Sequence, residues 1–229
     1  MLDIKKHRVV LLQILKDIYS DISIGPLLGF KGGTACHLFY NLPRFSVDLD
    51  FDLLDLEKER IVFNRVGEIL KSYGTIKDKS NKLNTLFFLL SYEHQAHNIK
   101  VEISKRNFGS EYEIKNYLGI SMLVMRKEDT LANKLVSLME RKNTANRDLL
   151  DTGFFLKHNW DLNKNIIELR TKMKVKEYLK KCILFVEKVN KKHILAGMGE
   201  LLDKKMKVWV KENLKQELLF LLKIRLKNL

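Results

Sequence analysis

Two aspartates separated by one residue, Asp48 and Asp50, are the strongest candidates for chemistry in this chain. They lie in FSVDLDFDL, where apolar and polar residues alternate, so this segment is predicted to be a β-strand with its acids on one face. Carboxylates a few ångströms apart repel each other unless a cation lies between them. Mg²⁺ or Mn²⁺ would relieve that repulsion, because such hard ions prefer oxygen ligands and also bind phosphates.

The same spacing has a simpler explanation, in which the acids form the solvated face of an edge strand. A third carboxylate would favour the metal site. Glu102 lies in IKVEIS, a second alternating segment, and is expected to project from the polar face of that strand. Asp52 is instead expected to be solvated. The predicted metal ligands are therefore Asp48, Asp50 and Glu102.

Two adjacent glycines, Gly32 and Gly33, precede the acids, between a predicted strand and a predicted helix. Glycine lets backbone N–H groups approach an anion, and Thr34 is expected to cap the helix and offer its hydroxyl. The segment is predicted to bind phosphate, although a glycine pair is also typical of an ordinary tight turn. Arg44 could contact a phosphate or equally a neighbouring carboxylate. The other predicted nucleotide-binding residues near this turn are Lys31 and Ser46.

The order of these motifs resembles a known superfamily. GGT, a helix and then RFSVDLDF is similar to the nucleotidyltransferases built on the DNA polymerase β catalytic core, whose signature is Gly-Ser, a helix and D-x-D. More closely, KGGTACHLFYNLPRFSVDLDF resembles the AbiEii/AbiGii toxins, the enzyme halves of abortive-infection toxin–antitoxin pairs in bacteria and archaea. VEISKR resembles the second segment of that family, and EDTLANKLVSLMER followed by NRDLLD resembles its later helical segment. The resemblance covers residues 27–155.

The resemblance implies a role for each matching residue. Asp48 and Asp50 would hold the metal, and Gly33 and Thr34 would contact the triphosphate. Glu102 would be the third acid and could also act as the base that activates the attacking hydroxyl. In the wider superfamily a serine is usual at the position of Thr34, and both residues supply a hydroxyl.

A second group of candidates lies further along the chain. By resemblance, Lys134 would reach the phosphates and Asp148 would complete the catalytic pocket. Lys134 and Arg141 are seven residues apart and so share a helical face, and both are predicted to bind the nucleotide. Asp148 and Asp151 are three apart on the next helix. Alternatively, these residues and Arg147 form a salt-bridge network that fixes helix packing.

The elements that must position these residues follow from hydrophobic periodicity. Helices are predicted at residues 3–20, from Thr34 towards Pro43 and at 55–72, with strands before the glycines, at 45–53, within 75–92 and at 99–104. From residue 127 onward the pattern is helical, with a break at Gly197 and Gly199. We therefore predict an α+β fold: a nucleotidyltransferase-type mixed β-sheet with flanking helices (1–125), then a C-terminal helical bundle (126–229) that contributes to the nucleotide pocket and to acceptor docking.

Charge and composition limit the partners. The net charge is +14, and residues 161–229 hold 18 Lys and Arg against 8 Asp and Glu, which favours a polyanion such as RNA. Cys36 and Cys182 are far apart and suggest neither a disulfide framework nor a thiolate zinc site, so a cytoplasmic location fits. No apolar run approaches the roughly 20 residues that cross a bilayer, so no membrane association is expected.

The predicted activity is transfer of NMP from an NTP to an acceptor hydroxyl, with Mg²⁺ as cofactor. The resemblance implies RNA as acceptor, specifically the 3′ end of tRNA, and a cognate antitoxin as partner. Two alternatives remain: an NTP-binding or partner-binding module of the same fold without transfer activity, and a basic structural RNA-binding protein.

Overall fold

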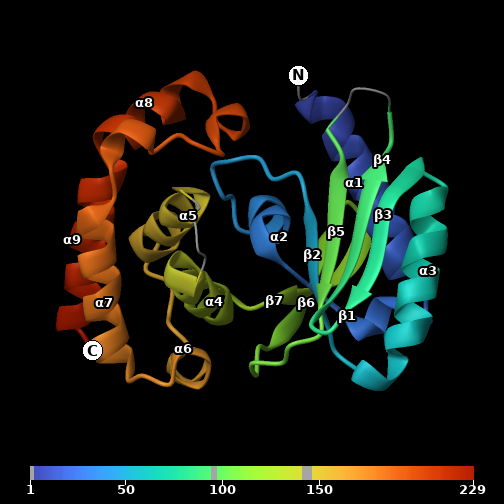
Figure 1. Cartoon of the computed structure of the whole chain (residues 1–229), viewed down its shortest axis with the longest axis horizontal. Coiled ribbons are helices and arrows are strands. Elements are labelled where there is room, and N and C mark those ends of the chain that lie inside the picture. Colours follow the sequence, from blue (N-terminus) through green and yellow to red (C-terminus); the bar gives the residue numbers. More distant parts are fainter. Residues whose placement is uncertain (1–2, 94–96, 141–145) are drawn as a thin grey trace. The chain divides into compact units, whose positions relative to one another are not determined.

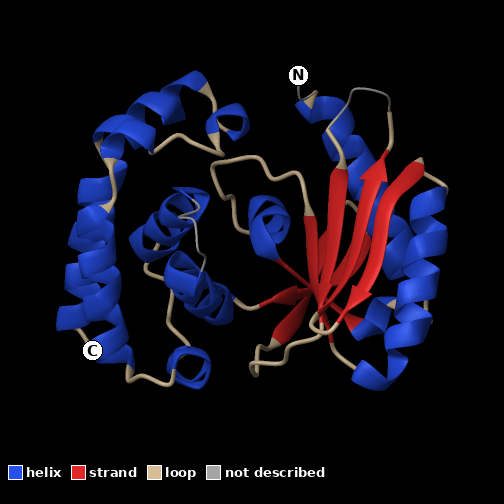
Figure 2. Ribbon diagram, in the orientation of Figure 1, coloured by secondary structure: helices blue, strands red, loops and turns tan. Residues whose placement is uncertain are grey.

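The computed structural model describes residues 3–93, 97–140 and 146–229. The chain divides into two compact units. The first comprises residues 1–107 and 111–125, and the second comprises residues 108–110 and 126–229. The first unit holds a β-sheet with helices on it, and the second is helical (Figure 1, Figure 2).

Within the described residues, the first unit contains a seven-stranded mixed sheet in the order β3-β4-β5-β2-β1-β7-β6. Pairing is parallel between β2 and β5 and between β1 and β7, and antiparallel elsewhere. Because β2 lies between β1 and β5, the explanation that places its acids on an edge strand is wrong. The strands are β1 (Leu28–Lys31), β2 (Leu49–Leu53), β3 (Thr75–Lys82), β4 (Thr85–Ser91), β5 (Ile99–Ser104), β6 (Tyr112–Tyr117) and β7 (Ile120–Met125).

The helices α1 (Ile4–Ser20) and α3 (Glu59–Lys71) cover one face of the sheet, and α2 (Gly32–Phe39) lies on the other (Figure 1). The period-two alternation of β2 sends Leu49 and Phe51 towards α1 and α3, where Phe51 contacts the rings of Phe30 and Tyr19. The intervening Asp50 and Asp52 therefore project on the α2 face.

Several boundaries differ from the sequence prediction. The helix predicted at residues 3–20 is present as α1, but β2 begins at Leu49, so residues 45–48 lead into the strand as irregular backbone. The helix α2 begins at Gly32 with Lys31 as its N-cap, so the prediction that Thr34 caps it is wrong.

The β6–β7 hairpin was not predicted. Its turn consists of Leu118 and Gly119, both with positive φ, which is typical of a type I′ turn.

The second unit has six α-helices among its described residues. They are α4 (Lys127–Glu140), α5 (Asn146–Lys157), α6 (Lys164–Thr171), α7 (Val175–Lys188), α8 (Lys204–Glu212) and α9 (Leu214–Lys227). The helices α4 and α9 both pack on α5, and α7 also packs on α9. The predicted break falls between α7 and α8, where Gly197 has φ of 74°. The fold is therefore the predicted α+β arrangement of a mixed sheet with flanking helices and C-terminal helices.

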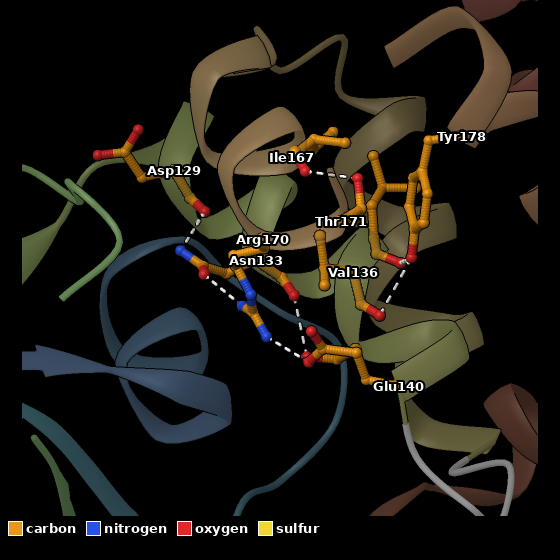
Figure 3. A network of polar contacts seen from close by, with 10 residues as sticks. Asp129, Asn133, Val136, Glu140, Ile167, Arg170, Thr171 and Tyr178 are labelled. Carbon is orange, nitrogen blue, oxygen red and sulfur yellow. Dashed lines mark hydrogen bonds and ion pairs between the residues drawn. The ribbon is translucent and has the colours of Figure 1, made fainter. Parts of the chain in front are cut away.

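A polar network fixes α4 against α6 (Figure 3). The guanidinium of Arg170 donates to Asn133 Oδ1 at 2.6 Å and also pairs with Glu140, about two turns further along α4. Asn133 Nδ2 in turn donates to the carbonyl of Asp129 at 2.9 Å. Arg170 also lies 4.6 Å from the ring centroid of Phe108, which belongs to this unit. These contacts order the helix that carries Lys134.

In the part of the chain that the structure describes, no helix combines the length and apolar character needed to cross a bilayer.

The close approach of Tyr112 to Gly29 provides a test of the sheet order. A Cβ at Gly29 would lie 2.3 Å from the Tyr112 ring, so Gly29→Ala is expected to cost about 1–3 kcal/mol of stability through overpacking. Urea denaturation measures the loss. Gly67→Ala in α3 is the matched control, because its Cβ would meet the movable end of Lys79 and alanine favours a helix. Equal effects in both variants would contradict the placement of Tyr112.

Candidate active site

The predicted acids converge on the α2 face of the sheet. The parallel pairing of β2 with β5 sets Asp50 beside Glu102, and the pairing of β1 with β2 sets Lys31 beside Asp50. Asp48 comes immediately before β2, two residues from Asp50. The structure thus brings Asp50 and Glu102 onto neighbouring strands of one face, with Asp48 directly before β2.

A lysine that the sequence prediction omitted lies among these acids. The Nζ of Lys100 is 3.1 Å from Glu102 Oε2 and 3.6 Å from Asp48 Oδ2. Burial lowers the pKa of Lys100, but the carboxylates of Asp48, Glu102 and Asp50 more than offset this and raise it above its ordinary value. Lys100 is therefore an ammonium. The signal was available in the sequence, because Lys100 precedes Glu102 by two residues in an alternating strand.

Burial raises the pKa of Asp50 above its ordinary value. The ammonium of Lys100 opposes this shift, and the negative charges of Asp48 and Glu102 add to it. An ionised Asp50 is therefore costly in the absence of a further cation.

The glycine turn is in contact with both the acids and the segment before them. A Cβ at Gly32, where φ is 78°, would lie 2.3 Å from Asp50 Oδ2, and a Cβ at Gly33 would lie 2.7 Å from Ser46 Oγ and from a guanidinium nitrogen of Arg44. Both positions thus exclude a side chain for steric reasons. The first N–H groups of α2 begin here, next to the acids, and such groups lack partners within the helix.

Two buried side chains hold the backbone that leads into Asp48. The hydroxyl of Thr34 donates to the carbonyl of Asp48, and Thr34 is only 3% exposed. On the other side, Nε2 of His7 lies 2.9 Å from the carbonyl of Val47, and Nδ1 lies 3.0 Å from the hydroxyl of Tyr92. His7 was missed by the sequence analysis, since nothing in its local pattern links α1 to residue 47.

Arg44 and Ser46 are both buried beside the turn. The guanidinium of Arg44 donates to the carbonyl of Phe45 at 3.1 Å and lies against Gly33. Arg44 is 4% exposed. These contacts fix the shape of the loop that precedes the acids, and a phosphate contact by Arg44 stays a prediction.

The prediction that Asp52 is solvated is wrong. Asp52 is buried and accepts hydrogen bonds from Lys31 Nζ and from the hydroxyl of Tyr112, each at 2.5 Å. Tyr112 reaches Asp52 from β6 across Gly29, which has no side chain to obstruct it. Lys31, predicted to bind nucleotide, is thus in an ion pair that neutralises Asp52, the second acid of β2.

The donor set is chemically suited to a hard divalent ion, since Asp48, Asp50 and Glu102 offer carboxylate oxygens and Asp50 lacks full charge compensation. However, among the described residues no three His, Cys, Asp or Glu side chains are grouped closely enough to hold a metal ion. The Lys100 ammonium contacts both Glu102 and Asp48 instead. The residues fit an ion held chiefly by Asp48 and Asp50.

The candidates of the second unit meet one another in a buried ion cluster. Lys134 Nζ lies 2.9 Å from Asp148 Oδ1 and 3.0 Å from Asp151 Oδ2. Both aspartates are almost fully buried. The cluster ties α4 to α5, as the packing alternative expected, and the roles of Lys134 and Asp148 towards a nucleotide stay predictions. Arg141 lies outside the described residues.

Comparison with solved structures gives the class of fold. A Helicobacter pylori protein assigned as a nucleotidyltransferase superposes with a TM-score of 0.64 at 22% identity, over 98% of this chain and 95% of that chain. JHP933 from Helicobacter pylori gives 0.63 at 23% identity, over 100% of this chain and 94% of that chain. The fold is that of nucleotidyltransferases.

The family is shown by a second comparison. The model of the family described as "Nucleotidyl transferase AbiEii toxin, Type IV TA system" matches residues 13–219. The chain belongs to this family, as the motif resemblance predicted. Among individually curated proteins, none matches the sequence.

Because the ionised carboxylate of Asp50 is unfavourable in the folded protein, its replacement by a neutral side chain is expected to raise stability. Asp50→Asn is expected to raise the thermal midpoint in EDTA by roughly 2–8 °C. Because the pKa of Asp50 is raised in the folded protein, wild-type stability falls as pH rises from the ordinary carboxylate range through the raised pKa. The gain should therefore be larger at pH 8 than at pH 4.5. The exposed Asp78→Asn is the control, and a pH-independent gain would contradict the assignment.

The ion cluster of the second unit predicts a large loss. Lys134→Met leaves two buried carboxylates without their ammonium, which is expected to cost about 3–5 kcal/mol in urea denaturation. Lys157→Met, which breaks an exposed pair with Glu217, should cost less than about 1 kcal/mol. Similar losses in the two variants would show that the cluster is not what holds α4 to α5.

Proposed function

We propose that this chain is a metal-dependent nucleotidyltransferase that transfers NMP from an NTP to an acceptor hydroxyl, and that it acts as the toxin of a toxin–antitoxin pair in the cytoplasm. The observation that carries the proposal is the placement of Asp48, Asp50 and Glu102 on one face of the sheet, beside Gly32. Membership of the AbiEii family supports it independently.

Each part of the site has a task in this mechanism. Asp48 and Asp50 would hold a divalent ion, Mg²⁺ or Mn²⁺, which when bound supplies charge neutralisation for the phosphates and lowers the pKa of the attacking hydroxyl. The N–H groups at Gly32 and Gly33 would donate to phosphate oxygens. Glu102 would accept the proton of the acceptor hydroxyl. Transfer then depends mainly on positioning and electrostatics.

We further propose RNA as the acceptor, specifically the 3′ end of tRNA. The support is the family resemblance together with the charge of the second unit. The helix α8 carries Lys204, Lys205, Lys207 and Lys211 against a single acid, Glu212. None of these lysines forms an ion pair with a described residue. Lysines free of acidic partners are available to phosphodiesters. A cognate antitoxin is proposed on family membership alone.

Incubation of the purified chain with each labelled NTP, Mg²⁺ and total RNA tests the activity. We expect label in RNA and release of pyrophosphate, and a loss of at least about a hundredfold in Asp48→Asn, because an electrostatic contact at the reacting phosphate is removed. Asp78→Asn, on β3, should retain full activity. Periodate-oxidised RNA, which lacks a 3′ hydroxyl, should accept no label.

The two alternative functions predict different results, which measurements of nucleotide binding, pyrophosphate release and RNA binding distinguish. A thermal shift with NTP and Mg²⁺ but no pyrophosphate release with any RNA would indicate a nucleotide-binding module. RNA binding that is unchanged or improved in Asp48→Asn, with no response to NTP, would indicate a structural RNA-binding protein.

A further inference from the structure

Lys100 occupies a position that the proposed mechanism has not used. Its side chain rises from β5 on the same face as Glu102, and its Nζ lies 3.1 Å from Glu102 Oε2 and 3.6 Å from Asp48 Oδ2. The side chain is 30% exposed, so protein surrounds most of it. An ammonium thus stands among the carboxylates where a metal ion would otherwise be needed.

The position of Lys100 is set by the backbone of an interior strand. The register pairs Lys100 with Leu89 of β4, and its neighbour Val101 with both Phe88 and Leu49. Both neighbouring residues of Lys100, Ile99 and Val101, are fully buried on the opposite face. The stem of Lys100 therefore starts from a rigid point, one strand away from Asp48.

The charges of the site can be counted directly. When Asp48, Asp50 and Glu102 are ionised they contribute three negative charges, and Lys100 compensates one of them. The other lysine nearby, Lys31, is paired with Asp52. Without a bound nucleotide, two negative charges remain on these side chains, which a single divalent ion balances, whereas two divalent ions beside Lys100 would leave the cluster with a net positive charge.

We infer that Lys100 is a built-in counter-cation that takes the place of one of the two metal ions used by two-metal phosphoryl-transfer sites, so that this site takes one divalent ion. The inference rests on the proposed function for its context. Glu102 pairs with Lys100, and Asp48 and Asp50 hold the single ion. Lys100 is accordingly a positioning residue, since it acts through the carboxylates.

The physical reason is the repulsion between like charges at short range. A divalent ion bound by both Glu102 and Asp48 would lie within a few ångströms of the Lys100 ammonium, where the effective dielectric constant is well below that of water. Removal of the Lys100 ammonium makes the position between Glu102 and Asp48 available to a divalent ion. Lys100→Met preserves the length of the stem and removes the charge, so it should restore room and charge for a second ion.

Titration of the full chain with Mn²⁺, followed by the EPR signal of the free ion, counts the bound ions without any turnover. We expect one tightly bound Mn²⁺ per wild-type chain and two in Lys100→Met. Lys105→Met is the matched control, because Lys105 pairs with Glu59 and Asn81 instead of with these acids, and it should bind one. Two tight ions in the wild type, or a count in Lys100→Met that stays at one, would overturn the inference.

Thermal unfolding supplies a second readout. In EDTA, Lys100→Met should melt below the wild type, because three carboxylates are left without a counter-ion, and Mn²⁺ should restore its midpoint. Lys105→Met should lose stability without recovery in Mn²⁺. An equal response of both variants to Mn²⁺ contradicts the inference, and if Lys100→Met does not fold, the wild-type ion count alone decides.

The result is separable from the proposed function. One Mn²⁺ in the wild type and two in Lys100→Met, with no label transfer from any NTP, would sustain the inference and defeat the activity. Label transfer by a wild-type chain that binds two ions would support the proposed activity and overturn the inference about Lys100.

Discussion

Repulsion between carboxylates on a single face of the sheet is the constraint around which the first unit is organised. Asp48, Asp50 and Asp52 alternate along one chain segment, and Glu102 is added from the adjacent strand. Such a density of negative charge is unfavourable unless cations are placed nearby. The strand order provides them, because β1 on one side of β2 and β5 on the other each contribute a lysine.

The lysines compensate the acids to different degrees. The acid that is fully paired stabilises the fold, and the acid that is not is the candidate for chemistry. Asp52 is fully satisfied by a lysine and a tyrosine, so it stabilises the sheet. Asp50 lies between the two lysines without full compensation, and burial raises its pKa. Stability is therefore lowered at the position where a ligand would bind, which is the usual relation between a folded scaffold and a reactive site. The anchors at the carbonyls of Val47 and Asp48 keep this strained segment in place.

The sequence was sufficient for the strands β1 to β5, the glycine turn and the segment that holds Asp48 and Asp50, because each has a local pattern: period two in the strands and two glycines before a helix. It was insufficient wherever the answer depended on strand order. The burial of Asp52 needs a tyrosine from β6 that crosses Gly29, and the anchor on Val47 needs a histidine from α1. The β6–β7 hairpin was missed because a leucine occupies the first turn position, where asparagine or glycine is the common signal. The position of Lys100 could have been predicted, because the alternation that places Glu102 on the polar face of its strand also places Lys100 there.

The pairing of β7 with β1 has a consequence for how the chain is made. The strand β1 leaves the ribosome well before its parallel neighbour β7, which ends at Met125, so one edge of β1 stays open during the synthesis of everything between them. Contacts so distant in sequence form slowly, and an open apolar edge such as that of Phe30 invites pairing with other chains. Nascent copies of this chain are thus expected to depend on chaperones until the β6–β7 hairpin has emerged.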